Sequence, residues 1–445
     1  MALFRRRPKV FYGWVVVAIS FTTLLINYSI SHAFSVFYVA ILKDFGWTRA
    51  DTALAYTVNR LVNGGSAPFV GTLIDRIGPR RLLPLGAVVM AIGLLATSQM
   101  NSIWQYILFY GTLCAIGTTS MGVVPNMTVL SNWFVRLRGT AAGFATAGIG
   151  VGMFLITPLA AFVIANWGWR AGYQVLAMIV LAVVPTLTAL FQRHRPQDMG
   201  LLPDGVAAGD NASIAAAAKA QDELVVDREW AAREWTVGRA IRTRRFWLVT
   251  IAMGTAVMST QTWLVHQTAL ITDAGYDLVL GSIIFAIVGI FGSAGKIIWG
   301  TVSDYIGREM SNTIGSVCTL AGILMLALIK DTSQPWMLYA FAVLFGIGYG
   351  THAPIHPAIT ADIFQGKNFG AIWGVVFVGT GAGTAFGPWL AGYIFDRTES
   401  YDGTVLFTSV SLVVSVVFFW LAAPRKVRLA SGQAKRAPRP AVAGR

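Results

Sequence analysis

Long apolar runs alternate with short polar segments along the chain, and one longer polar stretch near the middle separates six runs from six. About 20 apolar residues can cross the hydrocarbon core of a bilayer as a helix, so each run predicts one membrane span. The runs occupy residues 11–39, 52–74, 82–99, 104–130, 139–165, 172–191, 246–272, 279–303, 312–329, 336–360, 369–394 and 404–423. The pattern predicts an all-α integral membrane protein with twelve transmembrane helices.

The polar segments predict how the chain is divided. We expect an N-terminal six-helix half at 1–191, a linker at 192–245, a C-terminal six-helix half at 246–423 and a basic tail at 424–445. The linker ends in a stretch from Glu234 to Arg245, in which four arginines accompany Trp235 and which Phe246 follows directly. Such a stretch suits either a helix at an anionic membrane surface or a solvated connection.

Composition and charge agree with a membrane location. Apolar residues make up 55% of the chain and charged residues only 12%, which leaves more apolar surface than a soluble domain can bury. The net charge is +14, but 27 of the 34 lysines and arginines fall on one predicted side of the membrane and 5 on the other. This is the positive-inside pattern. It argues against a nucleic-acid partner and predicts a multi-pass protein of the cell (inner or plasma) membrane with both termini in the cytoplasm.

A short charged segment occurs twice, as Gly71–Arg81 after the second run and Gly300–Arg308 after the eighth. In each copy an aspartate ends one helix, a glycine permits a turn with positive φ, and basic residues follow. The candidate gating residues are Gly71, Asp75, Arg76, Gly78, Arg80, Asp304, Gly307 and Arg308. We expect the two aspartates to pair with basic residues of a neighbouring loop and to hold the cytoplasmic side closed.

A second duplication lies in the fifth and eleventh runs, where three alternate glycines precede a proline. Gly148, Gly150, Gly152 and Pro158 in the fifth run are matched by Gly379, Gly381, Gly383 and Pro388 in the eleventh. Glycines inside apolar helices let neighbouring backbones approach closely. The repeat therefore predicts two pseudo-symmetric halves that pack against each other.

The segment Gly-x-Leu-x-Asp-Arg-x-Gly-x-Arg-Arg at Gly71–Arg81, with its degenerate copy, resembles the loop signature of the major facilitator superfamily. Tyr12-Gly13-Trp14, Asn132–Gly139 and Phe364–Ala371 resemble the bacterial branch of the monocarboxylate porter group, which includes the oxalate:formate exchanger. The resemblance implies the major facilitator fold and secondary transport by alternating access of the two halves about a central site.

Two basic residues fall within predicted spans, where a charge costs roughly 2.5–3.5 kcal/mol and marks a functional candidate. Lys296 lies eight residues before Asp304, or about 12 Å into the membrane at 1.5 Å per residue, where a cation facing a water-filled cavity suits a small carboxylate. The alternative is a structural lysine bonded to backbone carbonyls. Arg60 lies in the outer half of the second span. It could contact an anion, form half of a gating ion pair, or simply extend its charged end to the membrane surface while its stem packs among apolar residues.

The resemblance refines the reading of Lys296. The matching position in the porter group usually carries an arginine that grips the substrate carboxylate, whereas lysine offers a point charge with looser geometry. The position four residues earlier, where the group has a proton-coupling aspartate, is Gly292. The exchanger's second cation would fall on Val376, so a monoanion fits better than a dicarboxylate.

His32 forms a polar stripe with Tyr28 and Ser35 at helical spacing on the first span, and it resembles the position of a first-helix lysine in animal monocarboxylate carriers. Two roles are compatible with this position of His32: it binds the substrate or a proton, or it is a core histidine whose hydrogen bonds are satisfied within the protein. No aspartate or glutamate falls at mid-membrane, so a transported proton would have to use a histidine, Lys296 or the substrate itself. His32 is the best candidate, with anion exchange and uniport as alternatives to symport.

Three further histidines lie in predicted spans of the second half. His352 and His356 share a helix face, but no third ligand is in view, so we expect no metal site. We expect His352 near the substrate and His266 at the external mouth. No phosphate loop or other cofactor motif is present, so no cofactor is expected.

These features predict a secondary active transporter of small organic anions, above all monocarboxylates such as lactate and pyruvate, acting as a monomer with protons as a candidate co-substrate. An enzyme is not expected, because no nucleophile is paired with a base. One alternative is an efflux carrier of amphipathic compounds, because its aromatic side chains could contact such compounds; these include Trp263, Trp373 and Trp389. Another alternative is a non-transporting receptor with the same fold.

Overall fold

The computed structural model describes residues 11–436 except 48, 206–218, 220 and 277. Within these ranges ten helical segments are long and apolar enough to cross a membrane. They are α1 (Gly13–Phe45), α3 (Pro79–Ser98), the segment Ile103–Trp133, α7 (Arg138–Phe191), α11 (Arg244–Asp273), α12 (Leu278–Ile306), α13 (Arg308–Ala327), the segment Trp336–Ile363, α16 (Phe369–Thr398) and α17 (Asp402–Ala422).

Two features bring the number of spans to twelve. The backbone of α7 breaks at Gly168, whose φ of 82° lies in the left-handed region that favours glycine, so this element holds two spans. The helix α2 (Arg49–Ile77) carries more charge than the others but has the length of a span and packs among them. The predicted all-α fold with twelve transmembrane helices is therefore confirmed, and the predicted ends agree to within six residues, the largest difference lying at the end of α1.

Two spans are less regular than the sequence suggested. The fourth comprises α4 (Ile103–Tyr106), the π-helix η1 (Ile107–Cys114), α5 (Ala115–Met121) and α6 (Val123–Trp133). The tenth is divided into α14 (Trp336–Tyr349) and α15 (His352–Ile363). Hydropathy gives the length of a span but does not reveal such local changes in helical hydrogen bonding.

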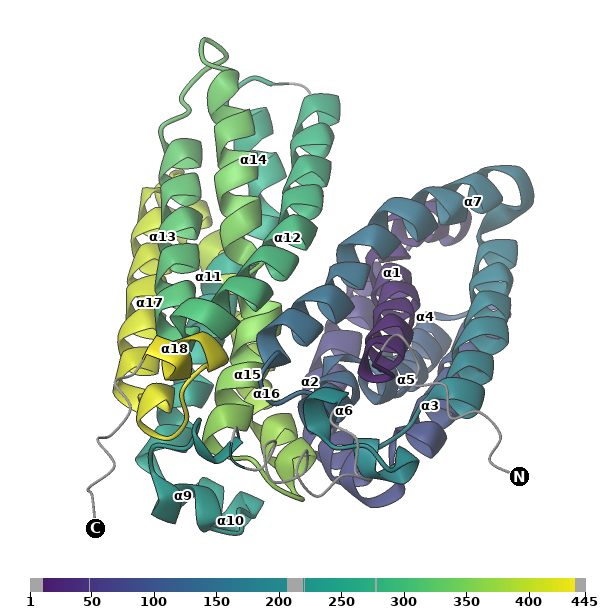
Figure 1. Cartoon of the computed structure of the whole chain (residues 1–445). Helices are drawn as coiled ribbons and strands as arrows, with labels where there is room; N and C mark the ends of the chain where they lie inside the picture. Colours follow the sequence, from purple (N-terminus) through teal and green to yellow (C-terminus); the bar gives the residue numbers. More distant parts are fainter. Residues whose placement is uncertain (1–10, 48, 206–218, 220, 277, 437–445) are drawn as a thin grey trace, which may run out of the picture.

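The helices form two bundles, one from α1 to α7 and one from α11 to α17 (Figure 1). The bundles meet where α2 packs against α16 and where α7 packs against α12. A Cβ atom on Gly71 would overlap the carbonyl oxygen of Gly370, and one on Gly139 would overlap that of Gly300. Because these four glycines have no side chains, the backbones of the two bundles come into close contact at two equivalent places, between α2 and α16 and between α7 and α12.

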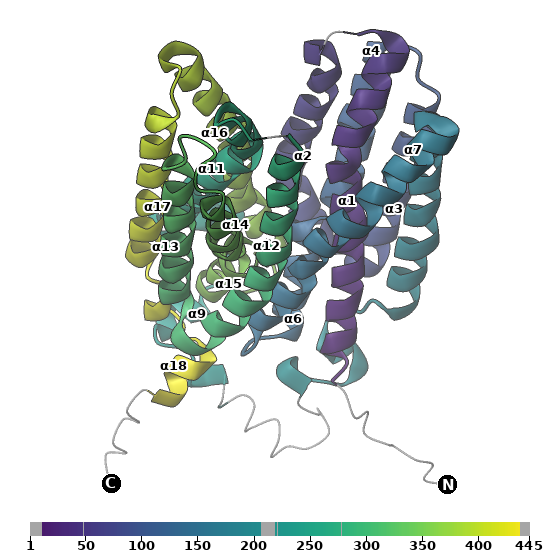
Figure 2. The same cartoon turned by 90° about the horizontal axis from the view of Figure 1, so that it is seen from above.

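The short elements between and after the bundles gather on one face, here called the linker face (Figure 2). They are η2 (Pro196–Met199), η3 (Pro203–Gly205), α9 (Arg228–Ala232), α10 (Val237–Ala240), η4 (Pro424–Lys426) and α18 (Ser431–Arg436). Trp235 is buried, and the indole of Trp230 donates a 2.8 Å hydrogen bond to the carbonyl of Ile363. The end of the linker is thus anchored to the second bundle, a contact that the sequence did not predict.

The segment after α17 joins this anchored layer. The amide of Val226 donates to the carbonyl of Val427 at 2.9 Å, so the linker and the C-terminal segment pair along their backbones. Ser431 Oγ lies 3.0 Å from the carbonyl oxygen of Arg136 in the first bundle and 3.1 Å from that of Asp304 in the second. The C-terminal segment therefore contacts both bundles at the linker face.

Candidate functional site

A carboxylate at the end of α2 caps a helix of the opposite bundle. Asp75 accepts hydrogen bonds from the amides of Gly370 at 3.1 Å and Ala371 at 2.8 Å, in the first turn of α16. The first amides of a helix lack acceptors within that helix, and the helix dipole favours a negative charge there. Asp75 therefore holds α2 and α16 together at the linker face.

The related aspartate makes the reciprocal contact. Asp304 at the end of α12 accepts from the amides of Gly139 at 3.1 Å and Thr140 at 2.8 Å, at the start of α7, and from the Thr140 hydroxyl at 2.7 Å. It is fully buried and also pairs with Arg308 Nη1 at 2.6 Å. Each bundle thus contributes one aspartate that caps a helix of the other, and we call these contacts the two latches.

For Asp75 the expected pairing with a basic residue is electrostatic only: the charge of Arg195 in the linker acts on it, while its hydrogen-bond donors are the two backbone amides. Arg76 is exposed, and Arg80 donates from Nε to the carbonyl of Ala189 at 2.8 Å. Charge spacing along the sequence did not reveal that a helix N-terminus from the other bundle would occupy this position. The turn glycines Gly78 and Gly307 have φ of 74° and 103°.

A buried ion cluster supports the latches, and sequence reasoning missed its central acid. Asp362 at the end of α15 pairs with Arg138 Nη1 at 2.8 Å and with Arg308 Nε at 3.1 Å. All three side chains are almost fully buried. Asp362 joins the first bundle to the second, and the available signal was an acid at the end of an otherwise apolar span.

A cavity of about 560 Å³ lies between the bundles, among residues of α1, α2, α7 and α12. Most of its lining is apolar or aromatic, and its polar lining includes His32 and Tyr56. The rings of Phe34 and Tyr56 are 4.7 Å apart and form part of its wall. Tyr56 was missed by the sequence analysis, because its position on the wall depends on how the helices pack.

Lys296 lies close enough to this cavity for its charge to act on His32 of the wall, but it is not among the residues that line the cavity. Its side chain is buried, and Nζ lies 5.1 Å from the centre of the Tyr349 ring, a cation–π contact. Among the residues described, no carboxylate forms an ion pair with Lys296. Its charge does act on His32, so the two residues are electrostatic neighbours.

Arg60 is the second cation of this region. Its Nη2 donates to Asn59 Oδ1 at 2.8 Å, and its guanidinium lies 4.8 Å from the centre of the Tyr56 ring. Within the described part of the chain, no carboxylate forms an ion pair with Arg60. A role for Arg60 as half of a gating ion pair is therefore not supported by these residues. Arg60 also acts electrostatically on His32 and on Tyr28.

The other candidate histidines are engaged elsewhere. His352 Nδ1 and His356 Nε2 are 3.3 Å apart, and both rings are buried. His266 Nε2 lies 3.0 Å from the carbonyl oxygen of Pro388, so this ring bridges α11 and α16 away from the cavity wall. The side chain of Ser35, the third member of the predicted stripe, lies outside the described residues.

Similarity to known proteins extends over most of the chain. The Major Facilitator Superfamily matches residues 17–355 and 315–444. Monocarboxylate transporter 13 of Bos taurus is 24% identical over 434 residues, covering 95% of this chain and 94% of the relative. Monocarboxylate transporter 11 of Homo sapiens is 22% identical, covering 93% and 83%. The MFS-type transporter YcxA of Bacillus subtilis (strain 168) is 23% identical, covering 91% and 95%.

Solved structures show the same fold. The proton:xylose symporter XylE, solved with 6-bromo-6-deoxy-D-glucose, superposes with a TM-score of 0.74 at 13% identity, over 95% of this chain and 99% of the symporter. At this identity the likeness concerns the arrangement of helices and carries no information about the substrate.

Proposed function

The chain belongs to the major facilitator superfamily and is a membrane transporter, and from this premise we propose that it carries small monocarboxylates by alternating access. Its relatives are transporters and not enzymes. Several of them are named monocarboxylate transporters, which supports this substrate class over others used within the superfamily.

The observation that carries the proposal is a pair of membrane-embedded cations without a carboxylate partner in the described residues. Lys296 belongs to the second bundle and Arg60 to the first, and both act on His32 at the cavity wall. Unpaired charges are costly at membrane depth, so a transported anion is the natural counter-ion. One carboxylate between the bundles would neutralise charge contributed by each of them.

The cavity supports a monoanion with an apolar body. Phe34, Phe154 and Phe285 contribute to a lining that is mainly apolar, and this favours a short aliphatic or aromatic group beside the carboxylate. A dicarboxylate would require a second polar contact in the same space. Lactate, pyruvate and simple aromatic acids meet both requirements.

The halves at 1–191 and 246–423 are the moving bodies of this proposal, and the linker face is cytoplasmic, as the charge asymmetry favours. In this proposal the two latches and the Asp362 cluster close that face. Transport requires these contacts to break as the cavity becomes accessible from the other side. We propose that the protein acts in the cell membrane as a monomer.

We also propose that His32 carries a proton together with the substrate. Protonation would add a third positive charge beside Arg60 and Lys296, which like-charge repulsion opposes. A bound carboxylate would offset that repulsion. Proton and carboxylate would therefore favour each other's binding, which is the linkage that symport requires.

A transport assay with purified protein in proteoliposomes tests the substrate class. Labelled lactate, pyruvate and benzoate should accumulate under an inward proton gradient, whereas oxalate and an organic cation of similar size should not. Protein-free vesicles control for passive entry of the protonated acids. Accumulation of the cation with no monocarboxylate uptake would favour the efflux alternative and refute the proposal.

A further inference from the structure

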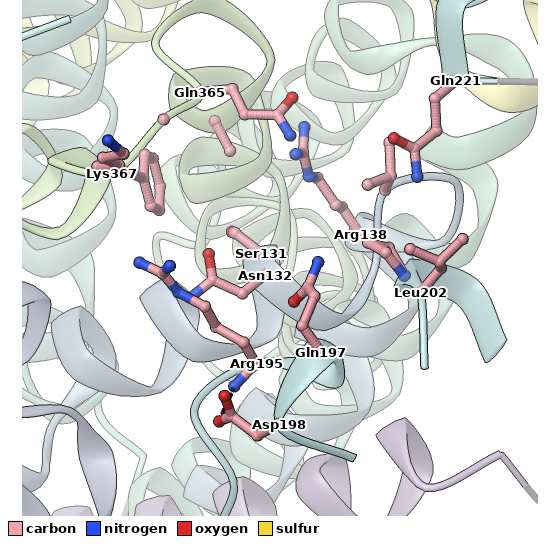
Figure 3. Close-up of a pocket in the computed structure, with 15 residues that line it drawn as sticks. Ser131, Asn132, Arg138, Arg195, Gln197, Asp198, Leu202, Gln221, Gln365 and Lys367 are labelled. Atoms are coloured by element: carbon pink, nitrogen blue, oxygen red, sulfur yellow. Dashed lines mark hydrogen bonds between the residues drawn. The ribbon is translucent and has the colours of Figure 1, made fainter. Parts of the chain in front are cut away.

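We propose that a pocket on the linker face binds a soluble multivalent oxyanion of the phosphate type and that binding holds this face closed. The pocket has a volume of about 650 Å³ and lies where the two bundles and the linker meet. Figure 3 shows that its polar side chains come from these three parts of the chain. They include Asn132 and Arg138 of the first bundle, Arg195 and Gln197 of the linker, and Gln365 and Lys367 of the second bundle.

Positive charge dominates the lining. Arg138, Arg195 and Lys367 contribute three cations, against one carboxylate from Asp198. Arginine donates in a fork that fits two oxygens of an oxyanion, and lysine adds a mobile point charge. The neighbouring amide side chains supply further donors. This combination suits an anion with more than one negative charge better than it suits a cation or a neutral solute.

An unmet hydrogen bond at Arg138 points independently to a ligand. Arg138 is only 3% exposed, its Nε donates to the carbonyl of Phe134 at 3.1 Å, and its Nη1 pairs with Asp362. Its buried Nη2 has no hydrogen-bond partner in the part of the chain that the structure describes. A buried donor left without an acceptor is unfavourable, and an oxyanion oxygen in the pocket would supply that acceptor.

Arg138 has a second arginine as an electrostatic neighbour. Arg428 of the C-terminal segment lies close to Arg138, and burial together with the charge of Arg138 lowers the pKa of Arg428 to about 10. Its buried Nε likewise lacks a hydrogen-bond partner among the described residues. An anion in the pocket would reduce this mutual repulsion.

The pocket exists only while the linker face is closed. Its lining comes from both bundles, so opening of this face would separate Asn132 and Arg138 from Gln365 and Lys367. A ligand that contacts both sides binds the closed state better and shifts the population toward it. The anion would therefore act as an inhibitor of the transport cycle, whichever substrate is carried.

Binding is measured by isothermal titration calorimetry of inorganic pyrophosphate into the detergent-purified full chain, with sodium chloride at matched ionic strength as the reference. Wild type should bind, and the double variant Arg195→Gln/Lys367→Gln should bind at least about tenfold more weakly, because it loses two charge-assisted contacts. The matched control is Arg242→Gln/Lys426→Gln, which removes two exposed cations outside the pocket. Its affinity should equal that of wild type.

A second measurement follows the closed state. In a Cys114→Ser/Cys318→Ser background, a cysteine replaces Ile74, which is fully buried between the bundles. Pyrophosphate should slow its reaction with a thiol reagent in this protein at least about twofold and should have no effect when the two pocket cations are replaced. These readouts need no transport substrate, so their failure would leave the proposed function untouched.

Three results would overturn the proposal. The first is no binding by wild type beyond the chloride reference, and the second is an equal loss of affinity in the control double variant. The third concerns the source of the anion. Native mass spectrometry that finds an anionic phospholipid retained by wild type and lost from the pocket variant would assign the pocket to a lipid headgroup.

Discussion

The carboxylate of Asp75 accepts a 2.8 Å hydrogen bond from the amide of Ala371, which lies 296 residues away in the sequence and in the other bundle. Asp304 repeats this relationship toward Thr140 in the opposite direction. The duplicated loop is thus a pair of reciprocal helix caps between the two halves. In an alternating-access cycle, contacts of this kind regulate the closed state of one face.

Asp75→Asn should slow turnover while leaving substrate affinity nearly intact. A hydrogen bond to a charged acceptor contributes about 1.5–3 kcal/mol, so weakening the latch destabilises one state of the cycle and should lower the turnover rate by roughly tenfold. Initial uptake rates over a range of substrate concentrations separate turnover from apparent affinity. A large loss of affinity with normal turnover would place Asp75 at the substrate instead.

Gly71→Ala should open the linker face. The added methyl would overlap the backbone of Gly370, and such overpacking costs about 1–3 kcal/mol. Gly65→Ala is the matched control in the same helix, because a Cβ there meets nothing within 4 Å. Thiol labelling of a cysteine at Ile74 should rise for the first variant only, and equal labelling of both would argue against a close contact between α2 and α16.

Asp362→Asn should strongly destabilise the protein. Removing the acid leaves Arg138 and Arg308 without a shared counter-charge, and breaking a buried pair costs about 3–5 kcal/mol. Thermal unfolding in detergent, followed by tryptophan fluorescence, measures the effect. Asp331→Asn, at an exposed loop position, is the control and should unfold like wild type. If both variants unfold together with wild type, the cluster is not a stabilising element.

The number and limits of the spans followed from hydrophobicity alone, because a bilayer requires long apolar helices. The duplicated aspartates were also visible, but their partners were not. Ala371 and Thr140 donate through their backbone amides, which every residue except proline has, so the sequence does not identify them as donors. The close contact of their helices with the facing helices depends on glycines. Tyr349 beside Lys296 and Asp362 between two arginines likewise arise from packing between distant segments. A polar stripe on one helix, such as the stripe that contains His32, predicts which residues share a helix face. It does not predict which residues of other helices that face contacts.

His32→Gln should remove the acid stimulation of carboxylate uptake. Uptake by wild type should increase as the external pH falls, because a carboxylate bound beside Arg60 and Lys296 offsets the repulsion that opposes protonation of His32. The amide of glutamine keeps a polar group on the cavity wall but carries no proton. Uptake rates measured between about pH 5.5 and 8 with a constant concentration of ionised substrate provide the comparison. An unaltered pH profile would make His32 a packing residue.

The central claim is that Lys296 binds the carboxylate of the transported monoanion. The most direct measurement is the uptake of labelled lactate or pyruvate by proteoliposomes that contain wild type, Lys296→Ala, Lys296→Arg or the exposed-lysine control Lys330→Ala. Uptake should be lost in Lys296→Ala, partly retained in Lys296→Arg because the charge is kept, and unchanged in Lys330→Ala. Undiminished carboxylate uptake by Lys296→Ala would contradict the account.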